Sequence, residues 1–96
     1  MKAFLLTFDQ SQTTRDEIVR FIDRIDAIEN GYALFEGAII IASRLTVGQV
    51  SSTIRDKFPD LKFILVEVDP RHKAGWLPRP VWAFLDDPHP AEPERA

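Results

Sequence analysis

Four short runs of apolar residues alternate along the chain with segments in which apolar residues recur every three or four positions. The runs are rich in aliphatic and aromatic side chains and are bounded by polar residues, a pattern that is typical of strands. They predict four strands, over residues 2–8, 32–36, 38–43 and 62–68. The last of these is the sequence KFILVEV.

The periodic segments predict two amphipathic helices. The first begins after Thr14 and is expected to stop at Asn30-Gly31, because glycine readily adopts the left-handed conformation that ends many helices. The second begins after Thr46 and ends before Pro59. Each start has Glu or Gln three residues after the threonine, which is the spacing of a capping box.

The order strand-helix-strand-strand-helix-strand predicts an α+β domain of the ferredoxin-like kind. Such a domain has an antiparallel sheet in the order 4-1-3-2, and two right-handed crossovers place both helices on one face. Pro80 is expected to begin a short C-terminal helix. We expect one ferredoxin-like domain over residues 1–85, including the Trp-containing C-terminal segment, and a disordered acidic tail over residues 86–96.

Strands one, three and four are apolar at both odd and even positions, so the sheet face away from the helices also needs a cover. Two covers are available: the segment 76–85 and a second copy of the chain. We expect both, with a homodimer as the main cover. Trp76 and Trp82 would cover the core, or alternatively stack on bases. The expected interface residues are Phe4, Leu6, Ile40 and Ile64.

Composition narrows the class of protein. The 96 residues include no cysteine, which excludes disulfides, thiolate metal sites and cysteine nucleophiles and suits a cytoplasmic location. No apolar run reaches the roughly 18 residues of a membrane-spanning helix, and none resembles a signal peptide. The net charge is −3, but residues 86–96 hold four of the 15 acids and one of the 12 bases, which leaves 11 of each in residues 1–85. A neutral domain binds phosphate weakly unless its bases cluster.

Asp9, at the end of the first strand, is the candidate metal ligand. We expect the first strand to run parallel to the third and antiparallel to the fourth, which would bring Ser43, Arg44 and Lys62 to the same edge as Asp9. Mg²⁺ often takes only one or two protein carboxylates, so Asp9 would hold Mg²⁺ while Arg44 and Ser43 contact a phosphate. The alternative is that Asp9 ends its strand by bonding to its own backbone.

Basic residues cluster after the fourth strand. Arg71, Lys73 and Arg79, together with Arg44, are the candidate nucleic-acid-binding residues, and His72 lies among them. The alternative is a solvated surface loop. No glycine-rich phosphate loop, paired metal-ligand histidines or hydrolase motif is present, so no catalytic residue is assigned.

The stretch FLLTFD, followed by a helix and then GYALFEG, resembles the small CRISPR-associated adaptation subunit. That family has a first strand ending in Asp and a later strand of the Y-S-V-F-E-G kind. Its members are ferredoxin-fold homodimers, described as metal-dependent nucleases or as DNA-binding subunits, and VapD-type toxins share the fold. The resemblance implies a homodimer with Asp9 as a metal-binding residue. The ending AGWLPRPVWAFL is similar to that of small bacterial proteins labelled SinR-like.

Two functions are therefore expected. The first is a homodimer that binds nucleic acid, or cleaves it with Mg²⁺ held by Asp9. The second is a non-catalytic interaction or regulatory dimer, which the neutral domain and the lack of a catalytic cluster favour. An enzyme acting on a small molecule is a more distant third, because dimers of this fold can form clefts between sheets.

Overall fold

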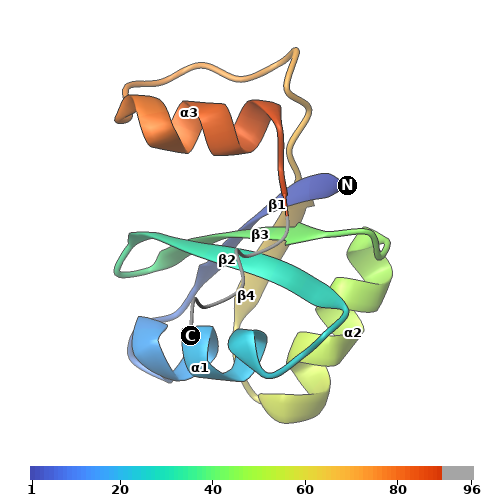
Figure 1. The fold of residues 1–96 in the computed structure, drawn as a ribbon. Coiled ribbons are helices and arrows are strands. Elements are labelled where there is room, and N and C mark those ends of the chain that lie inside the picture. Colours follow the sequence, from blue (N-terminus) through green and yellow to red (C-terminus); the bar gives the residue numbers. More distant parts are fainter. Residues whose placement is uncertain (90–96) are drawn as a thin grey trace, which may run out of the picture.

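Figure 1 shows the computed structural model, which describes residues 1–89. The elements follow one another as β1 (Lys2–Phe8), α1 (Arg15–Asp23), β2 (Ile28–Phe35), β3 (Ala38–Ser43), α2 (Val47–Lys57), β4 (Phe63–Glu67) and α3 (Arg79–Asp86). The chain is thus a small α+β domain with a four-stranded antiparallel sheet and three helices. No helix within the described residues is long and apolar enough to cross a membrane.

Helix α1 is shorter than the periodicity predicts. It ends at Asp23, with Arg24 as its C-cap, and the predicted stop at Asn30-Gly31 lies inside β2. That stop is therefore wrong. Asn30 and Gly31 pair with Ala42 and Ile41 of β3, so they belong to a strand. The side chain of Asn30 also accepts a 2.9 Å hydrogen bond from the backbone N–H of Gly31.

The capping box is confirmed for α2, where Thr46 and Gln49 form both bonds. At α1 it is confirmed only in part: Thr14 accepts from the backbone N–H of Glu17, but the Glu17 carboxylate accepts from the hydroxyl of Thr13.

The strands lie in the order β2-β3-β1-β4, which reads 4-1-3-2 from the β4 edge. Every neighbouring pair is antiparallel. The expectation that β1 runs parallel to β3 is wrong: Lys2 lies opposite Ser43, and Thr7 lies opposite Ala38. The short β2–β3 connection reverses the chain, and the crossover through α1 skips the strand between β1 and β2, so β3 must oppose β1.

The main core lies between the sheet and the two helices α1 and α2, which cover the same face (Figure 1). Phe4 and Leu6 point into it and are fully buried. The expectation that these two residues form a dimer interface is wrong, because they leave no surface for a second copy. The two polar residues of β1, Lys2 and Thr7, belong to opposite alternate sets, so its sequence does not reveal which set faces the helices.

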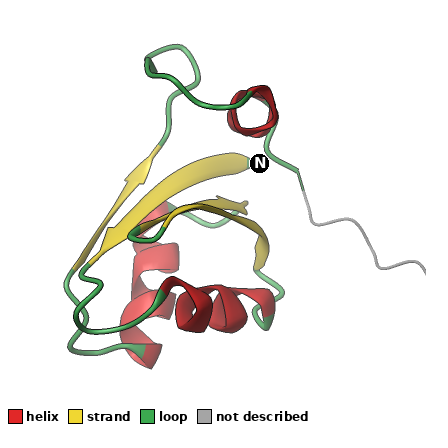
Figure 2. Ribbon diagram, turned by 90° about the vertical axis from the view of Figure 1, so that its left-hand side faces the viewer, coloured by secondary structure: helices red, strands yellow, loops and turns green. Residues whose placement is uncertain are grey.

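A second, smaller core lies on the opposite face, where α3 covers part of the sheet (Figures 1 and 2). We call this face the α3 face. Its fully or nearly buried residues are Ala3, Ile40, Ala42, Val81, Phe84 and Leu85. The prediction that the C-terminal segment covers the second face is confirmed for α3, and Ile40 lies beneath it with 1% exposure, so Ile40 is not an interface residue. Trp82 is half-buried, whereas Trp76 is 91% exposed, so the core-covering prediction is wrong for Trp76.

The C-terminal boundary differs slightly from the expected one. Asp86, the first residue of the expected tail, is the last residue of α3. His89 packs edge-on against Phe84, with ring centroids 5.3 Å apart, and its carbonyl accepts a hydrogen bond from the side chain of Asn30. Residues 90–96 of the expected tail lie outside the described residues.

Candidate functional site

Asp9 forms a compact turn at the end of β1. Its Oδ1 accepts a 2.9 Å hydrogen bond from the backbone N–H of Ser11 and a 2.6 Å bond from the Ser11 hydroxyl. These two bonds, the hydroxyl bond first, hold the pKa of Asp9 below its usual value, with a smaller contribution from the charge of Lys62. This geometry matches the alternative reading of Asp9, in which the carboxylate closes its own turn.

A neighbouring side chain that the sequence analysis missed holds this corner of the molecule together. The side-chain amide of Gln12 donates a 2.6 Å hydrogen bond to the carbonyl of Asp60 and accepts a 2.7 Å bond from the N–H of Lys62. The backbone N–H of Asp9 also donates to the carbonyl of Lys62. Lys62 therefore lies at the same edge as Asp9, as expected. We call these two side-chain bonds the Gln12 clamp. The sequence around Gln12 does not predict them, because their partners Asp60 and Lys62 lie 48 and 50 positions away.

Ser43 and Arg44 do not lie at the Asp9 edge, and the site that was expected to combine them is wrong. Because β1 and β3 are antiparallel, Ser43 lies opposite Lys2, at the other end of β1 from Asp9. Ser43 is fully buried: its hydroxyl donates to the carbonyl of Ala27 at 2.7 Å and accepts from the N–H of Leu45 at 3.1 Å. It is a structural residue with no free group for a ligand.

The described residues offer a poor fit to a resident Mg²⁺ ion. Within residues 1–89, no group of three or more His, Asp or Glu side chains is arranged to hold a metal. Asp9 alone would supply one carboxylate, and one of its oxygens already accepts two hydrogen bonds. Magnesium binding at Asp9 therefore stays a prediction.

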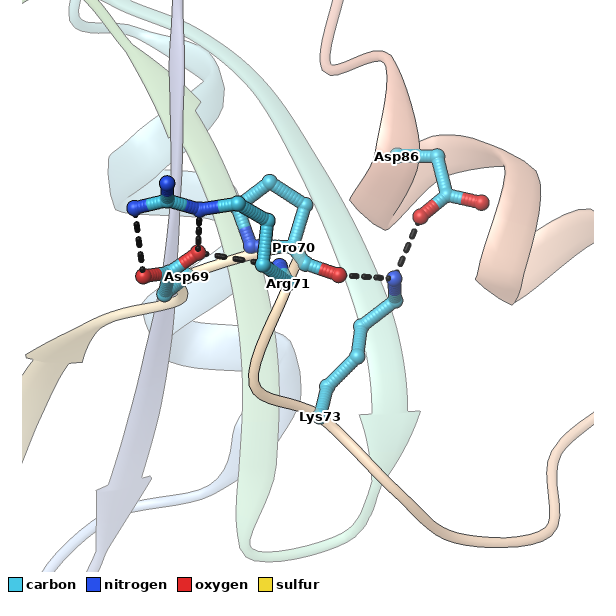
Figure 3. Close-up of polar contacts among 5 residues, drawn as sticks. All are labelled: Asp69, Pro70, Arg71, Lys73 and Asp86. Carbon is cyan, nitrogen blue, oxygen red and sulfur yellow. Dashed lines mark hydrogen bonds and ion pairs between the residues drawn. The ribbon is translucent and has the colours of Figure 1, made fainter.

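Three of the four candidate nucleic-acid-binding residues are paired with carboxylates. Arg44 pairs with Glu29. Arg71 pairs with Asp69 at 3.3 Å, and Lys73 pairs with Asp86 (Figure 3). The fourth, Arg79, is the first residue of α3. The pairing neutralises much of the charge that a phosphate backbone would need.

The loop after β4 is organised by these pairs. The backbone N–H of Arg71, and then its side chain, hydrogen-bond to Asp69 and lower the pKa of that carboxyl. Lys73 also donates to the carbonyl of Pro70 at 2.8 Å (Figure 3) and lies 5.7 Å from the ring centroid of Trp82. Lys73 thus ties the loop to α3. The cluster is a structural tether, and His72 contributes only a backbone N–H to it.

An exposed apolar strip lies on the α3 face beside the area that α3 covers. It consists of Ile64 and Val66 on β4, which are 62% and 43% exposed, and the half-buried Leu5 of β1, which lies opposite Val66. We call it the β4 strip. Ile64 was the one expected interface residue that is accessible. The strip adjoins the outer edge of β4, which is one of the two edges of the sheet.

No protein-family model, no curated protein and no solved structure matches the chain. The resemblance to the small CRISPR-associated adaptation subunit therefore stays a prediction.

Proposed function

We propose that the protein is a non-catalytic interaction module: a cytoplasmic, ferredoxin-like domain that acts as a homodimer. The observation that carries this proposal is the β4 strip, in which two large apolar side chains lie exposed next to each other on an edge strand. Exposed apolar edge strands readily pair with other chains, and stable monomers usually protect them.

The two edges of the sheet differ in a way that favours β4 as the interface. The β2 edge is interrupted by two register shifts, between Ile28 and Asn30 and between Ala33 and Phe35. Such irregularities protect an edge from pairing. The register of β4 against β1 has no shift from Phe63 to Glu67, so its outer side offers a regular row of backbone donors and acceptors.

A second copy of the chain is a suitable partner for this edge, because β4 of one copy can pair with β4 of the other. In an antiparallel pair centred on Leu65, Ile64 would lie directly opposite Val66 of the second copy, on the same face. The two-fold axis would repeat this contact, so both exposed side chains of each chain would gain an apolar neighbour. The pair would extend the two four-stranded sheets into one continuous sheet.

The test is sedimentation velocity from about 1 μM to about 1 mM, a range that covers binding free energies of about −8 to −4 kcal/mol. The parent chain should dimerise within this range, and Ile64→Asp and Val66→Asp should remain monomeric. The matched control is Val47→Asp on α2, which changes another exposed valine (40% exposed) away from the strip. A parent chain that stays monomeric throughout, or strip variants that dimerise as well as the control, would refute the proposal.

The nucleic-acid hypothesis has its own test. The pure chain is incubated with Mg²⁺ and either single-stranded RNA or duplex DNA, and binding is measured at two salt concentrations. Because most candidate bases are paired with acids, we expect no cleavage and little salt-dependent binding. Cleavage that Asp9→Asn abolishes would replace the non-catalytic proposal by a metal-dependent nuclease.

A further inference from the structure

The helix layer carries a groove of about 490 Å³ between the C-terminal ends of α1 and α2. Helices α1 and α2 lie on the far side of the sheet from α3 (Figure 1), so the groove that their residues line faces away from α3. Its apolar side chains are Phe21, Ile25 and Phe58, all half-buried. The rings of Phe21 and Phe58 meet edge to face with centroids 5.6 Å apart. The groove therefore has an apolar floor that water still reaches.

Three cations surround this floor: Arg20 and Arg24 from the α1 side and Lys57 from the end of α2. Within residues 1–89, Glu17 is the one acid that lines the groove, and its carboxylate already accepts a hydrogen bond from Thr13 at 2.8 Å. None of the three cations forms an ion pair with another residue of the described chain, in contrast to the paired bases after β4 and β3.

Two of the three cations follow each other at helical spacing, although Asp16 and Glu17 also lie four and three residues before Arg20. Arg20 and Arg24 are four residues apart, so their like charges face each other along α1. Basic residues at the ends of helices do complement the helix dipole, which accounts for the sign of each charge. The dipole does not account for the convergence of three cations around one partly exposed aromatic floor.

We propose that this groove, the α1–α2 groove, binds a short acidic segment of a protein partner. An apolar side chain of that segment would pack on Phe21 and Phe58, and flanking carboxylates would pair with Arg20, Arg24 and Lys57. Arg forms bidentate pairs with carboxylates, and a groove between helices is a common docking place for peptide segments.

The charges around the groove favour a short occupant over a nucleic acid. Asp23, Asp26 and Asp56 are exposed and lie within three residues of a rim cation. A long polyanion that crossed the groove would meet these carboxylates as well as Glu17. A segment of a few residues would meet fewer of them while its own acids contact the rim cations. The groove and the β4 strip lie on opposite faces, so this inference does not rest on self-association.

The experiment titrates the ¹⁵N-labelled full chain with three capped hexapeptides and follows amide shifts by NMR. The first contains four glutamates flanking a leucine and a phenylalanine, the second replaces the glutamates by glutamines, and the third replaces the two apolar residues by alanines. The first should shift the amides of Phe21, Ile25 and Phe58 saturably, and the other two should bind at least about tenfold more weakly.

Charge-neutralising variants identify the rim. The double variant Arg24→Gln with Lys57→Gln should weaken binding of the first peptide by about tenfold. The matched control is Arg55→Gln, an exposed cation on α2 that does not line this groove, and it should leave binding within about twofold. All these positions are on the surface, so the variants should keep the parent spectrum elsewhere.

Several results would overturn the proposal. One is that the groove amides show no saturable shift with the first peptide, and another is that the glutamate and glutamine peptides bind equally well. A third is that Arg55→Gln loses as much affinity as the double variant. The groove would be reassigned to another ligand if inorganic phosphate alone, or a single-stranded oligonucleotide, shifted the same amides more strongly than the first peptide does.

Discussion

Phe84 should contribute most of the packing energy that holds α3 against the sheet. It is 5% exposed, and its ring lies 6.0 Å from the ring of Tyr32 and 5.3 Å from that of His89. Replacing a buried phenylalanine by alanine destabilises a core by about 3–5 kcal/mol. Because α3 is a short surface helix that can partly relax over the gap, Phe84→Ala should fall at the low end, about 3 kcal/mol.

That loss is large for a domain of 96 residues. At about 0.05–0.15 kcal/mol per residue, the free energy of unfolding should be roughly 5–14 kcal/mol. A loss of about 3 kcal/mol should lower Tm by roughly 12–24 °C. Trp76→Ala is the matched aromatic control, since its side chain is 91% exposed, and it should change stability by less than about 0.5 kcal/mol.

The assay is urea unfolding followed by two signals. Both tryptophans, Trp76 and Trp82, belong to the C-terminal segment, so fluorescence reports on α3, while far-UV circular dichroism reports on the whole domain. The two transitions should shift together in Phe84→Ala. If Phe84→Ala stays within about 1 kcal/mol of the parent, or if fluorescence changes well before dichroism, then α3 is not part of the cooperative unit.

Three further predictions concern polar contacts. Ser43→Ala should cost about 1–3 kcal/mol in urea unfolding, because it removes both hydrogen bonds of a fully buried hydroxyl; a neutral effect would show that these bonds add nothing to stability. Thr46→Ala should cost about 1 kcal/mol by removing the N-cap of α2, whereas Thr53→Ala on the same helix should cost clearly less, and equal losses would argue against the cap. Ser11→Ala should raise the pKa of Asp9 toward 3.8 in an NMR titration of the carboxyl carbon, because the strongest bond that lowers it is lost. Since the folded-state pKa of Asp9 is the lower one, its contribution to stability is complete above about pH 4 and disappears as the pH falls through the folded value; an unchanged pKa in the variant would show that the bond has no effect.

Much of the fold follows from local patterns in the sequence. The element order and the starts of α1 and α2 depend on neighbouring residues, such as the threonine caps, and these were predicted correctly. The stop at Asn30-Gly31 was wrong because the same residue pair fits both a helix end and the start of an irregular strand. The direction of β1 relative to β3 depends on how the crossovers skip strands, which hydrophobic periodicity does not encode.

The candidate site was harder to predict, because its residues come together through distant contacts. The clamp made by Gln12 and the pairing of Lys73 with Asp86 each join separate segments of the chain. Composition showed that bases and acids balance in number, but not that individual pairs would form. The α1–α2 groove likewise combines residues from two helices, and each residue taken alone looks like an ordinary helix end.

The position of β1 has a consequence for how the chain folds during synthesis. β1 is translated before the other three strands of this sheet, yet it lies inside the sheet between β3 and β4. Its apolar residues can pair with β3 and β4 only after residues 38–43 and 63–67 have been translated. Contacts this far apart in sequence slow folding, and one side of β1 stays unpaired until β4 has been translated.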